Sequence, residues 1–179
     1  MKKFINRYKF ALILLALNGI LLITMPEIGF SSLGHTRDNT LEMLYVVPPI
    51  FIILGLLDVW VPRETMIQLM GEKSGPLGKL IAFLMGSLAA GPLYVAFPIA
   101  GLLLKKGSTF SNVLIFIGAW STTKIPLLLF EASALGWVFM LTRFTVNIFV
   151  ILIIAAITEK LLNASDKAEI YKRADSLSN

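Results

Sequence analysis

The chain has 179 residues, of which 56% are hydrophobic and only 15% charged, and its mean hydropathy is +0.80. Ordinary soluble domains are about 45–50% apolar and about 25% charged. This composition therefore excludes an ordinary soluble domain and indicates a helical integral membrane protein. The net charge of +5 at pH 7 is too thinly spread for a nucleic-acid surface, and the absence of cysteine excludes disulfides, thiolate metal sites and a cysteine nucleophile.

The first predicted membrane span is Phe10–Met25, which follows a basic N-terminal stretch and is ended by Pro26. A basic start before an apolar run is also typical of a secretory signal peptide, but no small-x-small cleavage site follows. We therefore expect an uncleaved span with its N-terminus in the cytoplasm. The next residues, Glu27–Thr40, are polar and rich in turn formers, which predicts a loop on the outer face.

The second predicted span is Leu41–Trp60, with Pro48 and Pro49 inside it. Asp58 lies near its inner end, where we expect the side chain to reach the cytoplasmic interface. Residues Thr65–Lys79 predict a short surface helix and a Ser-Gly-Pro loop on the cytoplasmic side.

Two further apolar segments, Leu80–Leu104 and Phe110–Phe130, are each interrupted in the middle. The first is broken at Gly91-Pro92 and again at Pro98, and the second is broken at Ser121–Pro126. Proline removes a backbone donor and clashes with the preceding helical turn. Broken backbone at membrane depth must be satisfied by protein or water, so it lines a cavity or is buried. A pair of interrupted apolar segments is the best pointer in a sequence to a transport site.

The charges after the first broken segment decide between two topologies. If Leu80–Leu104 crosses the membrane, Lys105-Lys106 and the basic tail lie outside, against the positive-inside rule. If the segment turns back near Gly91-Pro92, both basic clusters lie in the cytoplasm. The two arms would then be about 17–20 Å of helix each, which reaches past the middle of the bilayer. We favour the re-entrant hairpin over the crossing segment.

A short turn at Glu131–Gly136 precedes the last predicted span, Trp137–Ile157, in which Arg143 lies about two turns from the start. The sequence thus predicts an all-α polytopic integral membrane protein with about four transmembrane helices plus one broken or re-entrant helical hairpin. We divide it into an N-terminal span and outer loop (1–40), a permease-like membrane core (41–158) and a cytoplasmic tail (159–179).

The residue types at the two breaks indicate a binding site. Proline is favoured at the first position of a helix, so Pro92 and Pro126 can each open a half-helix. The N-terminus of a half-helix presents unpaired N–H groups and a partial positive charge, and Lys124 adds a full charge beside one of them. These groups suit a small anionic or oxygen-rich solute. The expected substrate-binding residues are Gly91, Pro92, Tyr94, Ser121, Thr122, Thr123, Lys124 and Pro126.

Other interpretations of these charged residues stay open. If the second broken segment is a full span, Lys124 lies about 10 Å from the outer surface and can snorkel to water. The kinks can also serve only to shape helix packing. Glu131 is expected to be wet in its turn. Arg143 lies deeper, and it is either the counter-charge of a carboxylate or a ligand of a lipid headgroup.

No sequence motif for catalysis is present. The chain has no His-Glu-x-x-His, no Gly-x-Ser-x-Gly and no P-loop motif, and it has too few histidines and carboxylates for a metal cluster. We therefore expect a protein that is not an enzyme, with no catalytic residues, no metal and no cofactor.

The order of these features resembles that of the predicted permeases that include the ArsP-type organoarsenical exporters. The resemblance covers about residues 41–157, from an acidic-aromatic exit at Leu57–Pro62 to the polar-Lys-Ile-Pro break, and Gly86–Gly107 carries most of it. It implies a permease, and it implies a half-length member, since full-length members contain two such units and this chain looks like one. The arsenical exporters place a cysteine in the break, where this chain has Gly91-Pro92. Because soft trivalent arsenic prefers thiolate ligands, an arsenical substrate is disfavoured.

We interpret the chain as a secondary transporter or channel-like permease of the cell inner membrane, with its site where Gly91-Pro92 meets Ser121–Pro126. The alternative is a non-transport scaffold or assembly subunit, and an intramembrane enzyme is disfavoured by the missing catalytic groups. The expected partners are membrane lipid, a small-molecule solute and a second copy of the chain. One unit has too few helices to shield its broken backbone from lipid, so we expect a homodimer in which Ser87, Gly91 and Gly118 permit close helix approach.

Overall fold

The computed structural model describes residues 2–89 and 91–176, with side chains described throughout these ranges except at residues 2–7 and 58. The prediction for Asp58 and the basic side chains before Tyr8 therefore lie outside the described residues. Within the described ranges every regular element is a helix and there is no strand, which confirms the all-α class. The elements are α1 (Lys2–Thr24), α2 (Pro26–Trp60), α3 (Arg63–Met70), η1 (Glu72–Ser74), α4 (Gly75–Leu88), η2 (Leu93–Val95), α5 (Ala96–Lys105), α6 (Phe110–Thr122), α7 (Ile125–Leu135), α8 (Trp137–Leu161) and α9 (Ala164–Ser176).

Three helical stretches among the described residues are long and apolar enough to cross a membrane: Pro26–Leu57, Phe110–Leu135 and Trp137–Leu161. Two shorter apolar stretches, Tyr8–Thr24 and Leu93–Lys105, accompany them. Of the four predicted spans, the first corresponds to the shorter apolar stretch Tyr8–Thr24, and each of the other three corresponds to a stretch long enough to cross a membrane. The chain divides into two compact units, Met1–Pro49 and Ile50–Asn179, which are described separately below.

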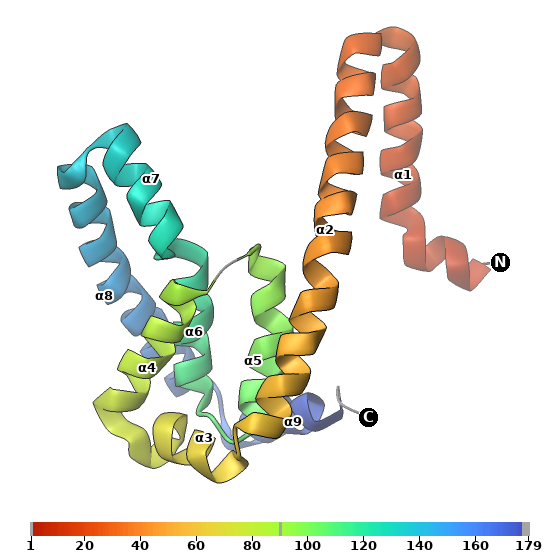
Figure 1. Ribbon diagram of the computed structural model, residues 1–179. Helices are drawn as coiled ribbons and strands as arrows, with labels where there is room; N and C mark the ends of the chain where they lie inside the picture. The colour runs from red at the N-terminus through yellow and green to blue at the C-terminus, as the bar shows by residue number, and fades with distance from the viewer. Residues whose placement is uncertain (1, 90, 177–179) are drawn as a thin grey trace. The chain divides into compact units, whose positions relative to one another are not determined.

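The first unit is a hairpin of α1 and the N-terminal part of α2, which lie side by side (Figure 1). The amide of Asn18 donates a hydrogen bond of 2.7 Å to the hydroxyl of Ser32 across the two helices. Gly29 permits a close approach, because a Cβ there would lie 2.8 Å from the backbone Cα of Leu22. The hairpin is thus tied together by one polar pair and one small residue in an otherwise apolar contact.

The predicted loop at Glu27–Thr40 is wrong, because these residues belong to α2. Pro26 starts the helix at a position that proline favours, and the carboxylate of Glu27 lies in the first turn, where it stabilises the positive end of the helix dipole. The hydroxyls of Thr36 and Thr40 donate to carbonyls four residues earlier, at 2.8 and 2.7 Å. The polar side chains are therefore satisfied inside a helix and do not require a loop.

In the second unit, α6 is the central helix and packs against α4, α5 and α8. Its buried side chains Val113, Ile115 and Phe116 form the apolar core. Two glycines bring the neighbouring helices unusually near. A Cβ at Gly86 of α4 would lie 2.4 Å from the carbonyl oxygen of Phe116, and one at Gly118 would lie 3.0 Å from the side chain of Ile151 in α8. Gly118, expected at a contact between subunits, is thus used inside the chain.

The first broken segment is a helical hairpin in which α4 and α5 run in opposite directions, and its predicted re-entry into the membrane stays a prediction. Figure 1 shows α4 running towards the break and α5 returning from it to the end of the unit where α3 lies. Hydrogen bonds confirm that the two ends meet: the N–H of Thr109 donates to the carbonyl of Met70 at 2.9 Å, and Lys106 Nζ donates to the carbonyl of Val61 at 2.6 Å. The hydroxyl of Tyr171 in α9 donates to the carbonyl of Ser108 at 3.0 Å. Lys105-Lys106 and the tail therefore lie at the same end of this unit.

The limits of the breaks differ from the predicted ones. Pro98 does not break α5, because it lies in the first turn, where a missing N–H costs no hydrogen bond. The second interruption is confined to Thr123 and Lys124, between the end of α6 and the start of α7. The predicted turn at Glu131–Gly136 is also wrong: α7 continues to Leu135, and Gly136 alone makes the turn with a φ of 90°.

Candidate functional site

The two breaks are joined by a lysine that donates to a glycine carbonyl. Lys124 Nζ lies 2.9 Å from the carbonyl oxygen of Gly91, and the indole N–H of Trp120 donates to the same oxygen at 3.3 Å. Gly91 has a φ of 103°, a conformation that glycine adopts without strain. The carbonyl that the first break removes from the helix ladder is therefore satisfied by one side chain of α6 and one of the second break.

A buried hydroxyl pair lies one step from this contact. The hydroxyls of Ser87 and Thr123 are 2.9 Å apart, and Thr123 is completely buried. The Thr123 hydroxyl also lies 3.0 Å from the carbonyl of Ala119, to which it donates. This assignment leaves Ser87 as the donor in the pair. A residue in the last turn of α4 and the first non-helical residue of the second break are thus held together by a satisfied pair.

An ion pair lies on the other side of the second break. Arg143 of α8 pairs with the Glu131 carboxylate of α7, and a second guanidinium nitrogen donates to the carbonyl of Thr122 at 3.3 Å. Thr122 is the last residue of α6, so the arginine places its positive charge at the negative end of that helix dipole. The interpretation of Arg143 as a counter-charge of a carboxylate is therefore confirmed.

The structure corrects the expectation that Glu131 is wet. Only 7% of its surface is exposed, because α7 continues past it and α8 packs against this face. One of its carboxylate oxygens, Oε2, has no hydrogen-bond partner among the described residues, and neither does the buried amide nitrogen of Asn147. Asn147 lies four residues after Arg143, which places both on one face of α8. The sequence signal for it was a lone amide within an apolar helix.

The N-terminus of α7 has the properties expected of a half-helix that receives a ligand. Lys124 is its N-cap, with extended backbone, and Pro126 lies in the first turn, as predicted. No side chain of the described residues caps the helix, so its first N–H groups are available to a bound group. Pro92, by contrast, precedes the short helix η2, and α5 starts only at Ala96.

This arrangement can be compared with known proteins. The ArsP_1 family model, whose description is predicted permease, matches residues 33–178. The chain belongs to this permease family. No curated protein and no solved structure shows significant similarity to the chain. The family and the apolar helices together make it a membrane protein, and they point to a transporter rather than an enzyme.

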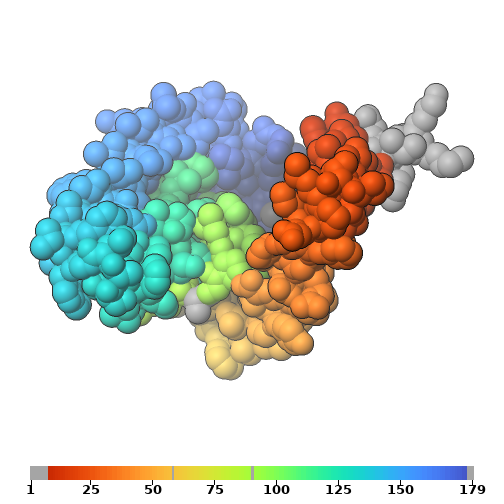
Figure 2. All heavy atoms as spheres, turned by 90° about the horizontal axis from the view of Figure 1, so that it is seen from above, coloured from red at the N-terminus to blue at the C-terminus, as the bar shows by residue number. Residues whose placement is uncertain are grey.

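The permease fold brings some of the predicted site residues together and leaves others at the surface. Gly91, Thr123 and Lys124 meet at the junction of the breaks, and Thr122 donates its hydroxyl to the carbonyl of Gly118 at 2.9 Å. Figure 2 shows the segment after the first break, in light green, beside the turquoise segment of the second. Exposed residues surround the junction: Tyr94, Ser121 and Pro126 are exposed, and Pro92 is half-buried.

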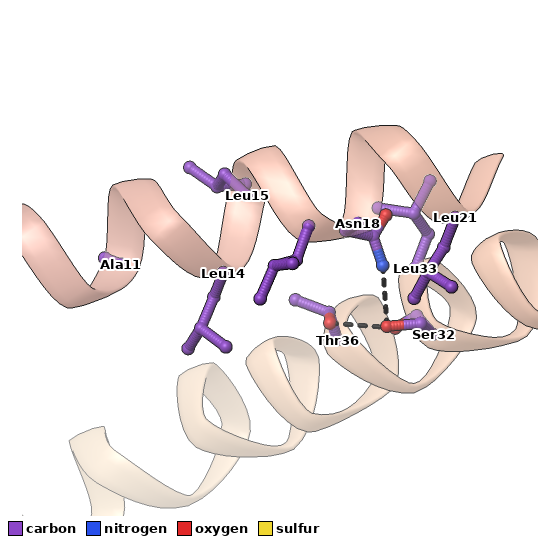
Figure 3. Close-up of a pocket in the computed structure, with 9 residues that line it drawn as sticks. Ala11, Leu14, Leu15, Asn18, Leu21, Ser32, Leu33 and Thr36 are labelled. Carbon is purple, nitrogen blue, oxygen red and sulfur yellow. Dashed lines mark hydrogen bonds between the residues drawn. The ribbon is translucent and has the colours of Figure 1, made fainter. Parts of the chain in front are cut away.

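Two cavities lie away from the breaks. In the first unit, a groove of about 530 Å³ runs between α1 and α2, lined mainly by leucines around the Asn18–Ser32 hydrogen bond (Figure 3). In the second unit, a cavity of about 500 Å³ lies at the end where α3, α5 and α9 meet, with Arg63, Lys105 and Tyr171 among its lining residues. Burial raises the pKa of the Tyr171 hydroxyl above its usual value of 10.0. Neither cavity contains a residue predicted to bind the solute.

Proposed function

We propose that the protein is a secondary permease for a small anionic solute, which binds where the two breaks meet. The observation that carries this proposal is the contact of Lys124 with Gly91, because it places a positive charge at the junction of two interrupted helices. Family membership supports transport in general. Charged groups at membrane depth are rare and typically belong to a substrate or ion pathway.

The chemistry of the junction favours an anion. Lys124 and the uncapped N-terminus of α7 both contribute positive potential, and the second break has no acidic side chain of its own. In this structure the ammonium group of Lys124 donates a hydrogen bond to the carbonyl of Gly91. An anion would replace this carbonyl as the acceptor, and the indole of Trp120 would still satisfy Gly91. Exchange of one acceptor for another keeps the lysine paired in both states.

The proposal includes an orientation in the cell inner membrane. Lys105-Lys106 lies at the same end of the second unit as the tail, where Arg63 and Lys73 are also found. Basic residues concentrate on the cytoplasmic side of membrane proteins, so we place this end in the cytoplasm. By the same rule we place the N-terminus, whose basic residues belong to the sequence at the start of α1, in the cytoplasm, and we propose that membrane lipid surrounds the apolar helices.

We further propose that a second copy of the chain covers the exposed side of the junction. Tyr94, Ser121 and Pro126 are exposed beside the breaks, and broken backbone in lipid requires cover by protein or water. Transporter sites typically lie between two structural repeats, and one copy of the chain supplies one hairpin and one broken span. A homodimer would supply the second pair. Ser87 and Gly118 already make contacts within the chain, so we propose Tyr94, Ser121 and Pro126 as the residues of this interface.

One observation favours the alternative of a membrane scaffold. The polar groups at the breaks are paired within the chain: Lys124 with Gly91, and Ser87 with Thr123. A protein in which the breaks serve only helix packing would also need its buried polar groups to be hydrogen-bonded, with no solute involved. The two functions are therefore separated only by measuring transport.

The test is uptake into proteoliposomes. Purified protein is reconstituted, and uptake of radiolabelled phosphate, sulfate, lactate and methylarsonate is compared with uptake by protein-free liposomes. Trivalent methylarsenite serves as a neutral comparison solute. We expect saturable uptake of at least one anion and none of methylarsenite, because the chain has no thiolate. Uptake that equals the protein-free background for every solute would favour the scaffold.

A further inference from the structure

A polar cluster with one buried and two half-buried residues lies on α7 and α8, apart from the lysine that joins the breaks. It consists of Glu131, Arg143 and Asn147 (the inner cluster). The side chain of Glu131 is 9% exposed and that of Arg143 is 29% exposed. Both helices belong to stretches that are long and apolar enough to cross a membrane. Ionisable residues at such positions are costly and typically belong to ion or proton pathways.

The inner cluster contains unsatisfied groups. Glu131 Oε2 and Asn147 Nδ2 have no hydrogen-bond partner among the described residues, although both atoms are buried. A buried polar atom without a partner costs free energy, so natural proteins keep few of them, and those that persist call for an explanation. The free oxygen of Glu131 is an acceptor, and the simplest group that it can take up is a proton.

The inner cluster is also connected to the second break. Arg143 holds the Glu131 carboxylate and the carbonyl of Thr122 at the end of α6. Ile151 packs on Gly118, and Asn147 lies one turn before Ile151 on the same face of α8. Because α8 runs back alongside α6 (Figure 1), Asn147 lies at the level of the last turn of α6. A change in the ion pair would therefore act directly on the residues that precede Lys124.

No other charge competes for the carboxylate from the helices that pack around it. The sequence of α6 has no charged residue, and α8 has Arg143 as its one charge between Trp137 and Thr158. Within α7, Glu131 is the one charge, and Lys124 is the N-cap about two turns away. The protonation state of Glu131 therefore decides whether the cluster is neutral or carries one positive charge.

We propose that Glu131 is the proton-binding site that couples anion transport to a proton gradient. A proton from water binds Oε2, which converts the carboxylate to a neutral acid, while Arg143 keeps its charge. The cluster then changes from neutral to a net charge of +1, and Arg143 is released to share an anion with Lys124. Proton and anion are thus bound together and carried in the same direction. This inference rests on the proposed anion permease.

A metal cation in place of the proton does not fit the cluster. Among the described residues there is no group of three or more acidic or histidine side chains that could hold a metal ion. A proton needs one acceptor atom, and Glu131 has one free.

Two measurements test this proposal. The first needs no solute: infrared difference spectra of the protein in liposomes are recorded while the pH is lowered. We expect a carboxylic-acid carbonyl band from a buried group, which Glu131→Gln removes and which the exposed-site control Glu64→Gln retains. Identical spectra for the wild type and Glu131→Gln would overturn the proposal, whatever the protein transports.

The second measurement uses the anion identified by uptake. For one proton carried with one monovalent anion, an inward gradient of one pH unit accumulates the anion about tenfold. We expect the wild type to approach this ratio and Glu131→Gln to equilibrate the anion without accumulation. Anion uptake that ignores the pH gradient in the wild type would refute proton coupling and leave the permease proposal intact. Because this readout uses the wild type, a folding defect of the variant does not affect it.

Discussion

The substitution Gly86→Ala tests the packing that positions the junction. Gly86 lies on α4 next to Ser87, and its missing side chain lets α4 contact the backbone of α6. An added Cβ would lie 2.4 Å from the carbonyl oxygen of Phe116, which is about 1 Å short of the ordinary contact of 3.4 Å. It would also lie 2.8 Å from the Cβ of Ala119 and 2.9 Å from the backbone nitrogen of Trp120. Since two of these neighbours are backbone atoms, the helices must separate.

The size of the effect follows from two opposing contributions. Overpacking a well-packed contact costs about 1–3 kcal/mol. Replacing glycine by alanine inside a helix gains about 0.5–1 kcal/mol. With three neighbours closer than 3.0 Å, we take the upper part of the first range, which gives a net loss of about 2 kcal/mol. Separation of α4 from α6 would also stretch the bond between Ser87 and Thr123.

The assay is thermal unfolding in mild detergent, followed by size-exclusion chromatography with fluorescence detection. A chain of this size shifts its midpoint by about 2–4 °C for each kcal/mol, so Gly86→Ala should unfold about 4–8 °C below the wild type. The matched control is Gly55→Ala in α2, where a Cβ meets nothing within 4 Å, and it should unfold at or above the wild-type midpoint. Equal midpoints for the two variants would refute the close α4–α6 contact.

Three further predictions concern topology, the ion pair and the tail. A cysteine at position 107 (Gly107→Cys) should react with a membrane-impermeant thiol reagent in inverted vesicles and not in intact cells, and labelling of intact cells would contradict the cytoplasmic placement of that end. Arg143→Gln should lower the free energy of unfolding by about 3–5 kcal/mol, because it leaves a buried carboxylate unpaired, and adding Glu131→Gln should restore most of it in the same unfolding assay. Burial raises the pKa of the Tyr171 hydroxyl in the folded tail. The neutral hydroxyl should therefore stabilise the docking of α9 fully below pH 10.0, and this stabilisation should be lost as the pH rises through the raised pKa of the folded state. A spin label on α9 should report this release, and Tyr171→Phe should abolish its pH dependence.

The positions of the helix breaks in the membrane core could be predicted because particular residue types mark them. Proline and glycine mark the breaks at Gly91 and Pro126, since both residues change what the backbone can do locally. The charge of Lys105-Lys106 favoured a hairpin over a crossing segment, and α4 and α5 do form a hairpin. These signals are local or additive along the chain, so they can be read without knowing which helices pack together.

Other features depend on tertiary contacts that a sequence does not state. The burial of Glu131 depends on α7 continuing to Leu135 and on an arginine from the next helix, neither of which has a local signal. The polar residues at Glu27–Thr40 indicated a loop by composition, yet their hydroxyls bond within a helix. Likewise, Pro98 resembled a second break because its position relative to the start of α5 was unknown. In each case the residue is compatible with two structures, and its contacts with neighbouring residues determine which one forms.

The central claim, that solute binds at the junction of the two breaks, is tested most directly by anion uptake into proteoliposomes containing Lys124→Ala, with exposed Lys79→Ala as the matched control. We predict that Lys124→Ala weakens anion binding by at least about 1.5 kcal/mol, which raises the half-saturating concentration more than tenfold, whereas Lys79→Ala matches the wild type. Ser121→Ala should also impair uptake, while all three variants elute from size exclusion like the wild type. Wild-type uptake by both Lys124→Ala and Ser121→Ala would contradict the claim and show that the lysine serves only to satisfy the carbonyl of Gly91.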